Sequence, residues 1–166
     1  TSAFEQIQHA FNYAEVYQIP VIVLTEKVIA ESQTMVEPFA QKKIPIKRGL
    51  VSSSAELQKL QRSDRYKITP SGISKRWNPG SSEAFYFANS DEHWADGTLT
   101  ETGEQCGQMQ EKRMKKHEAI AKEIPEPKIY GDKKKADISF VGWGSSKGTV
   151  LDAMKELKKQ KISVNY

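Results

Sequence analysis

The sequence has one cysteine, Cys106, and no long apolar run. A single thiol excludes an internal disulfide framework and any zinc site built on several cysteines, and it is typical of a reducing compartment. The longest apolar run covers residues 19–24, far short of the ~20 residues needed to cross a bilayer. Residues 4–17 are amphipathic and carry acidic side chains, which argues against a signal peptide. We therefore expect a cytoplasmic protein with no membrane partner.

The excess of charge of one sign is also small. The net charge is +4, from 25 Lys and Arg against 21 Asp and Glu. Basic residues gather at 112–116 and 133–135, but no aromatic residues are interleaved with them and no binding motif accompanies them. We therefore expect no nucleic-acid partner. Acidic residues flank the first basic run, which predicts a solvated helix face there.

The N-terminal region has the pattern of a helix followed by a strand. Apolar residues from Phe4 to Ala14 recur at spacings of three and four, which predicts an amphipathic helix over 4–17. Pro20 ends this helix. Residues 21–24 are apolar and mostly β-branched, which predicts a strand buried on both faces, as in a parallel sheet. A helix packed against such a strand is half of an α/β unit.

Prolines and glycines interrupt the sequence between residues 38 and 100. We expect short extended segments at 41–48, at 66–73 with a turn, and at 84–88. The last of these is the strongest strand candidate, and a polar cluster at 89–93 follows it directly. The end of a buried strand is where α/β folds place their ligands.

A second, highly charged helix is expected over 101–123, followed by a proline-containing linker over 125–135. The remaining residues have the order strand, glycine-rich turn, helix, strand, which predicts a right-handed βαβ unit. These elements are expected at 137–141, 142–148, 150–157 and 162–164.

The predicted fold class is therefore α/β, in two incomplete domains. The first covers 1–124 and the second 136–166, with the linker 125–135 between them. We predict that the strands at 21–24 and 138–141 are parallel strands of two different sheets. Neither strand has a full sheet around it, so the chain is expected to begin inside one domain and to stop inside the next.

The densest set of titratable groups is Asn89-Ser90-Asp91-Glu92-His93. One imidazole and two carboxylates can support acid–base chemistry or hold a substrate by hydrogen bonds. The alternative is a loop whose Asn and Asp side chains cap turns and whose His is exposed. The sequence leaves both readings open. Adjacent positions do not have metal-ligand spacing, so we expect no metal site.

Residues 142–148, Gly-Trp-Gly-Ser-Ser-Lys-Gly, form a second candidate. Backbone amides between a strand and a helix can hold a phosphate at the helix N-terminus. The spacing matches neither the Walker A motif nor the dinucleotide fingerprint, so a tight connection capped by serine is favoured. His9 and His117 fall on predicted helices and are expected at a surface or interface. Cys106 has no nearby histidine in sequence and is not expected to be a nucleophile.

Several short segments, spread over nearly the whole chain, match the sequence pattern of a single protein family. They are residues 11–26, Ala30-Glu-Ser32, Asp64-Arg-Tyr-Lys-Ile-Thr69, 89–93, Glu111-Lys-Arg-Met114, Gly131, Ala136-Asp137 and 141–148. Taken together and in this order, they resemble the alpha subunits of 2-oxoacid:ferredoxin oxidoreductases. The resemblance is greatest to the 2-oxoglutarate type.

The resemblance implies a fold for each half of the chain. Residues 1–124 would contain the C-terminal part of a pyrimidine-binding domain of the thiamine-diphosphate-binding fold. Residues 136–166 would be the start of a transketolase C-terminal-like domain.

The resemblance also implies oxidative decarboxylation of a 2-oxoacid on thiamine diphosphate, with the acyl group passed to coenzyme A and the electrons passed through an iron–sulfur cluster to ferredoxin.

In this family the beta subunit holds the thiamine diphosphate, its magnesium and typically the cluster. The fragment alone is therefore expected to bind no cofactor and no metal, and the single cysteine agrees with this. The implied partners are the beta subunit and ferredoxin, with a 2-oxoacid and coenzyme A as substrates. No catalytic residue is assigned, no cofactor-binding residue is identified, and Asn89, Asp91 and His93 are the expected substrate-binding residues.

Two departures from the family pattern limit the transfer of roles. Residues 66–71, Tyr-Lys-Ile-Thr-Pro-Ser, resemble the family's substrate motif Tyr-Pro-Ile-Thr-Pro-Ser-Ser only superficially, because their neighbours match a later segment. Trp94 stands where the family often has an acid.

Two other functions stay open: the same reaction on pyruvate or a branched-chain 2-oxoacid, and a non-catalytic α/β assembly module that docks partners through its charged helix.

Overall fold

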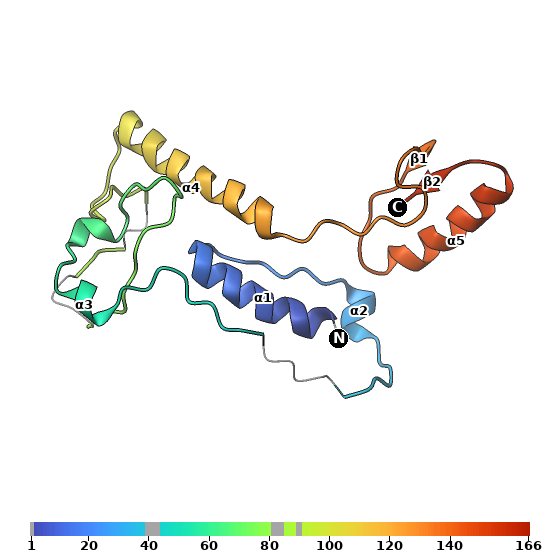
Figure 1. Cartoon of the computed structure of the whole chain (residues 1–166), viewed down its shortest axis with the longest axis horizontal. Coiled ribbons are helices and arrows are strands. Elements are labelled where there is room, and N and C mark those ends of the chain that lie inside the picture. The colour runs from blue at the N-terminus through green and yellow to red at the C-terminus, as the bar shows by residue number, and fades with distance from the viewer. Residues whose placement is uncertain (1, 39–43, 81–84, 89–90) are drawn as a thin grey trace. The chain divides into compact units, whose positions relative to one another are not determined.

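The computed structural model describes residues 2–38, 44–80, 85–88 and 91–166 (Figure 1). Helices and strands are mixed along the chain, with five α-helices, one 3-10 helix and two strands among these residues. The elements are α1 (Ser2–Tyr17), α2 (Lys27–Glu31), α3 (Ser54–Leu57), a 3-10 helix (Arg62–Asp64), α4 (Gly103–Glu123), β1 (Ile138–Ser139), α5 (Ser146–Lys159) and β2 (Val164–Asn165).

The chain divides into two compact units. One consists of Thr1–Ile22 with Gln41–Ile124, and the other of Val23–Ala40 with Pro125–Tyr166. Each unit therefore combines two separate stretches of sequence. The domain boundaries expected from the sequence, at 1–124, 125–135 and 136–166, stay a prediction.

The helix predicted over 4–17 is confirmed as α1. It ends where Gln18 adopts a positive φ of 52°, two residues before Pro20. The apolar stripe from Phe4 to Phe11 is exposed, and the buried apolar side chain of this helix is Tyr17. Burial, with a hydrogen bond to Glu123, raises the pKa of Tyr17 to about 12.

Polar contacts hold α1 to the rest of the first unit. The Asn12 side chain donates to the Pro45 carbonyl at 2.9 Å and accepts from the Lys47 N–H at 2.9 Å, as a strand neighbour would. Glu15 lies 3.7 Å from the Arg48 guanidinium and also pairs with Arg76. The region after residue 44 is therefore attached to α1 through side chains rather than through a sheet.

The helix predicted over 101–123 is confirmed as α4 (Figure 1), and Pro125 follows its C-cap residue, Ile124. Its buried residues are Met109 and Lys112. The expectation that the basic run 112–116 forms a solvated face is wrong at Lys112, which is 6% exposed. The reason is geometric, because Lys112 lies three residues after Met109 and hence on the same face of the helix.

Four extended segments predicted within residues 21–88 do not form strands among the described residues. Residues 21–24 and 85–88 are irregular, and Ile22 is 80% exposed. Residues 44–48 and 66–73 are irregular as well, although the turn predicted in 66–73 is present, with the Gly72 N–H donating to the Thr69 carbonyl at 3.0 Å. Positions 41–43 and 84 lie outside the described residues. A strand needs a hydrogen-bonded neighbour, and local composition cannot supply one.

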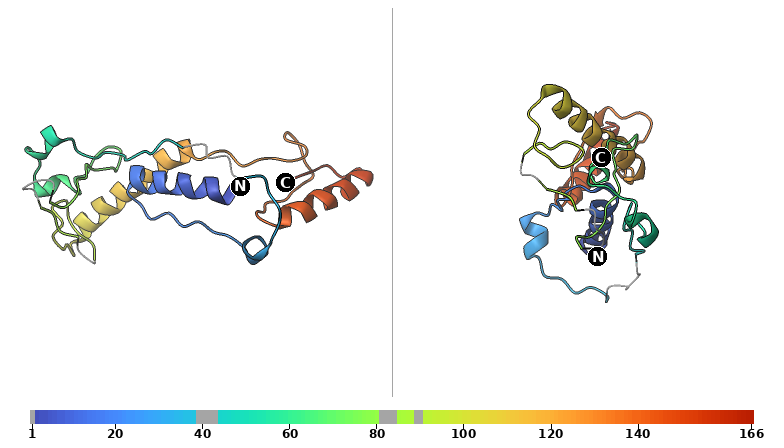
Figure 2. Two further views of the ribbon diagram at one scale, coloured as in Figure 1. Left: turned by 90° about the horizontal axis from the view of Figure 1, so that it is seen from below. Right: turned by 90° about the vertical axis from the view of Figure 1, so that its left-hand side faces the viewer.

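The second unit contains the predicted βαβ arrangement. Strands β1 and β2 are parallel, with Ile138 opposite Val164 and Ser139 opposite Asn165 (Figure 1). Helix α5, coloured red in Figure 2, contacts β2. On the other edge of β2, Gly131 forms an antiparallel bridge with Asn165. The helix predicted at 150–157 is confirmed, while the two strands are shorter than predicted. The prediction of strands 21–24 and 138–141 in two sheets is wrong, because residues 21–24 form no strand.

The apolar core is small. Among the described residues, the buried hydrophobic side chains are Tyr17, Trp77, Met109 and Val164. Trp77 packs edge-on against Tyr86, with ring centroids 5.4 Å apart. None of the described helices has the length and apolarity that a membrane crossing requires.

Candidate functional site

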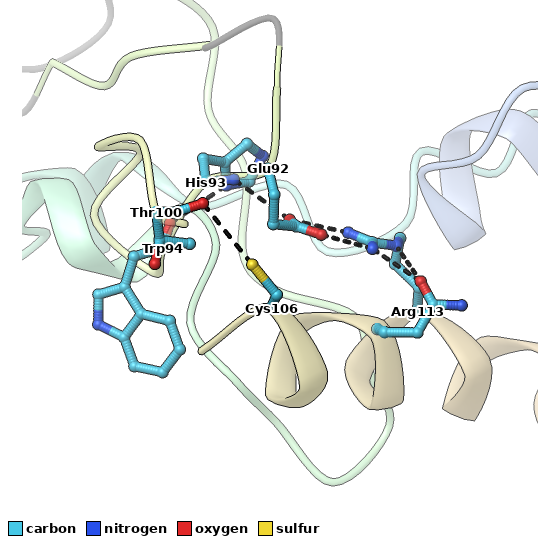
Figure 3. Close-up of polar contacts among 7 residues, drawn as sticks. Glu92, His93, Trp94, Thr100, Cys106 and Arg113 are labelled. Carbon is cyan, nitrogen blue, oxygen red and sulfur yellow. Dashed lines mark hydrogen bonds and ion pairs between the residues drawn. The ribbon is translucent and has the colours of Figure 1, made fainter. Parts of the chain in front are cut away.

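The polar loop at 91–93 lies in the first unit, close to the start of α4 (Figure 3). Asn89 and Ser90 lie outside the described residues. Asp91 is exposed, and it makes no hydrogen bond or ion pair within the described part of the chain. Glu92 and His93 are both half-buried. The structure therefore shows that Asp91, Glu92 and His93 differ in burial, which the sequence alone could not predict.

Glu92 is held by the Arg113 guanidinium of α4. Arg113 Nη1 donates to Glu92 Oε1 at 2.9 Å and Nη2 donates to Oε2 at 2.5 Å, a bidentate pair (Figure 3). These hydrogen bonds hold the pKa of Glu92 below its usual range and raise that of Arg113. Gln110, one turn earlier on α4, accepts from Arg113 Nη2 at 2.7 Å. Both oxygens of the Glu92 carboxylate are therefore bound in a structural ion pair with Arg113.

His93 is stacked against Tyr66, with ring centroids 4.0 Å apart. Its Nδ1 lies 3.1 Å from the Trp94 carbonyl oxygen, which can only accept, so Nδ1 carries the proton. This leaves Nε2 to accept a hydrogen bond or, when protonated, to donate one. An antiparallel bridge between His93 and Leu99, closed by the turn from Trp94 to Gly97, fixes the backbone. The ring is therefore held in one orientation, and among the described residues Nε2 has no hydrogen-bond partner.

Tyr66 is the centre of an aromatic and cationic cluster. The Arg65 guanidinium lies 4.8 Å from the centroid of the Tyr66 ring and 5.3 Å from that of Tyr86. Tyr86 meets Tyr66 edge-on at 6.3 Å. Burial raises the pKa of the Tyr66 phenol. The ring that supports His93 is thus itself packed on two sides.

Lys112 anchors this cluster from α4. Its Nζ donates to the Tyr66 carbonyl at 2.7 Å, and no carboxylate pairs with it among the described residues. Burial, reinforced by the neighbouring charges of Lys116, Arg65 and Arg113, lowers the pKa of Lys112 to about 8. The backbone of Tyr66 is therefore positioned by a buried ammonium group.

Gln18, at the C-terminal end of α1, connects the remaining cations. Its side-chain oxygen accepts from Arg65 Nη1 at 2.9 Å, and its backbone carbonyl accepts from Lys116 Nζ at 3.1 Å. A cation at a helix C-terminus is favoured by the helix dipole. Burial, with the charges of Arg65 and Arg113, lowers the pKa of Lys116. The loop, α1 and α4 are therefore joined through one basic cluster.

The other candidates from the sequence do not join this site. His9 and His117 are exposed on α1 and α4. The Cys106 thiol lies 3.6 Å from the Thr100 carbonyl and is half-buried, and none of the histidines the structure describes pairs with it (Figure 3). Within the described part of the chain, no group of His, Cys, Asp and Glu side chains could hold a metal ion. In the second unit, residues 142–148 connect β1 to α5, and Ser145 at the N-cap makes no side-chain cap.

Sequence reasoning missed Arg113, Lys112 and Tyr66. A signal for the lysine was present, because positions 109, 112 and 116 share one helix face, and the face that carries Met109 is buried. No local signal links Glu92 to Arg113 or Lys112 to Tyr66, since these pairs are 21 and 46 residues apart. Chemically, the site offers the oriented imidazole of His93 and the exposed carboxylate of Asp91. The Glu92–Arg113 ion pair holds the loop that carries them.

The chain is similar to several characterised proteins, although no family model matches it. It is 34% identical over 165 residues to a 2-oxoacid:ferredoxin oxidoreductase subunit alpha of Saccharolobus solfataricus, a match that covers 96% of this chain. It is 37% identical over 159 residues to subunit alpha of 2-oxoacid:ferredoxin oxidoreductase 1 of Sulfurisphaera tokodaii, covering 93%. A third such subunit, from Aeropyrum pernix, is 32% identical over 171 residues and covers 99%.

A solved structure agrees with these relatives. It is a 2-oxoglutarate:ferredoxin oxidoreductase from Magnetococcus marinus with 2-oxoglutarate, coenzyme A and succinyl-CoA bound. It superimposes on 93% of this chain with a TM-score of 0.75 and 28% sequence identity. The similarities place the chain in the class of oxidoreductase subunits.

Within that class, the chain belongs to the family of 2-oxoacid:ferredoxin oxidoreductase alpha subunits. It spans about a quarter of the length of these relatives, 25% and 24% for the first two. The family expected from the sequence is thus confirmed.

Proposed function

We propose that this chain is part of the alpha subunit of a complex that oxidatively decarboxylates 2-oxoglutarate. The reaction would form succinyl-CoA and carbon dioxide from 2-oxoglutarate and coenzyme A, and it would reduce ferredoxin. One observation carries the proposal: the relatives named as alpha subunits match 93–99% of this chain. The choice of 2-oxoglutarate is supported by the similar solved structure, whose ligands are 2-oxoglutarate, coenzyme A and succinyl-CoA.

We assign residues 1–124 to the end of a pyrimidine-binding domain with a following irregular region and charged helix, and 136–166 to the start of a transketolase C-terminal-like domain. The parallel β1–α5–β2 unit is consistent with the second assignment. An iron–sulfur cluster does not fit this chain's own donors, because such clusters are held by several cysteine thiolates and the sequence has one cysteine. As the resemblance to the family implies, we assign the cluster, thiamine diphosphate and magnesium to the beta subunit, with ferredoxin as the electron acceptor.

The loop at 89–93 would lie on the substrate side of the complete active site. His93 is the best-supported residue, because its ring is oriented by Tyr66 and the Trp94 carbonyl while Nε2 is left available. A protonated Nε2 can donate a charge-assisted hydrogen bond to the second carboxylate of 2-oxoglutarate. Asp91 is exposed, so it can orient this imidazole or a cation of the partner subunit.

The substrate is tested in the assembled complex of alpha and beta subunits. Ferredoxin reduction would be measured with 2-oxoglutarate, pyruvate and a branched-chain 2-oxoacid, each with and without coenzyme A. We expect the highest kcat/KM for 2-oxoglutarate. A higher value for pyruvate or the branched-chain acid would contradict the proposed substrate, and no reduction with any 2-oxoacid would contradict the enzymatic function.

The role of the loop is tested in the same complex with His93→Ala and Asp91→Ala. Losing one charge-assisted hydrogen bond costs about 1.5–3 kcal/mol, so kcat/KM for 2-oxoglutarate should fall roughly ten- to a hundredfold. The value for pyruvate should change less, because pyruvate has no second carboxylate. His117→Ala, at an exposed histidine of α4, is the control and should leave both values unchanged. An equal change for both substrates would make the loop structural.

A further inference from the structure

The net positive charge of the chain is confined to residues 125–166. This stretch holds nine lysines against five aspartates and glutamates, whereas residues 1–124 hold 16 basic and 16 acidic side chains. The whole net charge of +4 therefore belongs to 125–166, which lies in the second compact unit. Charge that is segregated in this way produces a local positive potential, which attracts partners of negative charge.

The acidic side chains of this stretch neutralise few of its lysines. Two acids pair with the lysines that follow them by three positions on α5, Lys155 and Lys159, each at 2.7 Å. Asp132 and Asp137 instead accept hydrogen bonds from backbone N–H groups, at 2.8–3.2 Å. Five exposed lysines form no ion pair with another described residue, and we call them the lysine face: Lys133, Lys134, Lys135, Lys158 and Lys161.

The members of the lysine face border one hollow of the second unit. Lys158 and Lys161 line a cavity of about 640 Å³ together with Asp132. Asp132 directly precedes the basic run 133–135. The Ser163 hydroxyl, two positions after Lys161, donates to the carbonyl of the last residue of this run at 3.1 Å. Lysines from the linker and from the end of α5 are therefore brought together by the fold.

Lys161 occupies a backbone conformation that favours glycine. It follows the C-cap residue of α5 and has a φ of 64°. Its N–H donates to the Lys158 carbonyl at 3.0 Å, and the Ile162 N–H donates to the Leu157 carbonyl at 3.1 Å. This is the pattern in which helices commonly end at a glycine. A lysine held in such a strained conformation indicates that its side chain has a function.

We propose that the lysine face is a docking surface for an acidic protein, the ferredoxin of the proposed reaction. The identity of this partner rests on the proposed function, which requires ferredoxin as the electron acceptor. An iron–sulfur cluster held by cysteine thiolates carries a net negative charge, because the sulfides and thiolates outweigh the iron ions. A carrier of such a cluster therefore has a negative potential near it. Exposed lysines steer a partner of this kind and raise its association rate.

The test uses the assembled complex, with the whole alpha subunit, and an oxidised ferredoxin that carries [4Fe–4S] clusters. The Kd is measured by surface plasmon resonance without substrate, at low and at physiological ionic strength. Lys158→Glu together with Lys161→Glu should raise the Kd at least about tenfold at low ionic strength, and less when salt screens the charges. Replacing Lys133, Lys134 and Lys135 by glutamine should change the Kd in the same direction.

Lys115→Glu together with Lys122→Glu is the matched control. It reverses two exposed lysines of α4, in the part of the chain where the charges balance, and it changes the net charge by the same amount. The Kd for ferredoxin should stay that of the natural complex, because only the local charge of the docking surface matters.

Lys161→Gly separates loss of charge from loss of folding. Glycine accepts the positive φ, so this variant should melt at a temperature at least as high as that of the natural complex. It should nevertheless bind ferredoxin more weakly, because one lysine of the face is removed. Unchanged binding by Lys161→Gly would contradict the function assigned to this side chain.

Reduction of methyl viologen with 2-oxoglutarate, followed in the same complexes, should not differ between the variants. Its absence in the natural complex would contradict the proposed function, whereas the Kd values still decide the docking surface. The docking proposal is overturned if the natural complex does not bind ferredoxin, or if the α4 control weakens binding as much as reversal of Lys158 and Lys161. It is also overturned if that reversal prevents assembly with the beta subunit in size-exclusion chromatography, because the face would then be a subunit interface.

Discussion

The Glu92–Arg113 pair shows how one ion pair can hold a loop against a helix. Arg113 contacts both carboxylate oxygens, and Glu92 in turn accepts from the His93 N–H at 3.2 Å. The pair thus fixes the residue immediately before the candidate histidine. Its contribution should depend on pH, since the pKa of Glu92 is lowered in the folded chain.

We predict that Arg113→Met lowers the melting temperature at pH 7. The stabilisation is about 1 kcal/mol or less, because the Arg113 side chain is 48% exposed. A carboxyl with a lowered folded pKa stabilises the protein above its unfolded pKa of about 4.3, and the effect is lost as pH falls through the folded value. The difference between variant and natural chain should therefore shrink below about pH 4. Thermal melts from pH 7 to pH 3 measure this.

Lys115→Met is the matched control for Arg113→Met. It removes a positive charge from the exposed face of the same helix turn, and Lys115 forms no ion pair with the other described residues. Its melting temperature should follow that of the natural chain at every pH. An Arg113→Met effect of equal size at pH 7 and pH 3 would show that the loss comes from packing rather than from the charge pair.

Gly72 occupies a position where the backbone conformation and the close packing both require glycine. Its φ is +73°, and an added Cβ would overlap the Lys112 carbonyl oxygen. We predict that Gly72→Ala destabilises the chain by at least about 2 kcal/mol, from left-handed backbone strain and overpacking together. The free energy of unfolding from denaturant titration measures the effect.

Gly80→Ala separates the two contributions to the Gly72→Ala effect. Gly80 has a φ of +78°, but a Cβ there meets nothing within 4 Å. The control should therefore lose about 1 kcal/mol through backbone strain alone. Equal losses for both variants would show that the turn from Thr69 to Gly72 does not pack tightly on α4.

At the scale of the element, α4 joins the loop to the buried cluster. One face carries Met109 and Lys112, which are buried, while Met114 lies 52% exposed on another. The helix therefore has a narrow buried stripe that includes an ammonium group. Its position is set by Lys112 and by Arg113, which contact Tyr66 and Glu92 respectively.

We predict different costs for the same substitution at two positions of α4. Met109→Ala should destabilise the chain by about 2 kcal/mol or more, because it leaves a cavity around a side chain that is 2% exposed. Met114→Ala should change the free energy of unfolding by less than about 0.5 kcal/mol. Denaturant titration measures both. Similar costs at the two positions would contradict the orientation of α4.

At the scale of the whole molecule, the two compact units have few buried apolar side chains, and the chain spans about a quarter of its relatives. The proposed reaction needs thiamine diphosphate and an iron–sulfur cluster, and the single cysteine cannot ligate such a cluster alone. On the proposed function, we therefore expect the chain to supply positioning residues rather than the reacting groups.

We predict that the purified 166-residue chain oxidises no 2-oxoacid. The assay would contain thiamine diphosphate, magnesium, coenzyme A and an artificial electron acceptor, with 2-oxoglutarate and pyruvate tried separately. The complete alpha–beta complex, assayed in parallel, is the positive control. Turnover by the isolated chain above the level without protein would contradict the prediction and the assignment of the cofactors to the beta subunit.

The sequence by itself determined the long helices, the βαβ unit and the family. The helices predicted over 4–17, 101–123 and 150–157 all formed, because their periodicity is a local property in which every backbone hydrogen bond lies within the segment. The resemblance to the family could be recognised equally well from the sequence, since it depends on the order of residues alone. Even the turn at Gly72 followed from its Pro-Ser-Gly composition.

Only the tertiary structure decided which apolar segments become strands and which polar residues meet. Residues 21–24 and 85–88 have strand composition but pair with no other described segment, and pairing is a long-range event. The bond from Lys112 to Tyr66 joins residues 46 positions apart, and that from Ser145 to Glu26 joins residues 119 apart. Such contacts depend on how the elements pack. A basic residue that looked solvated therefore proved to be buried, and a carboxylate at one short helix proved to occupy the N-terminus of another.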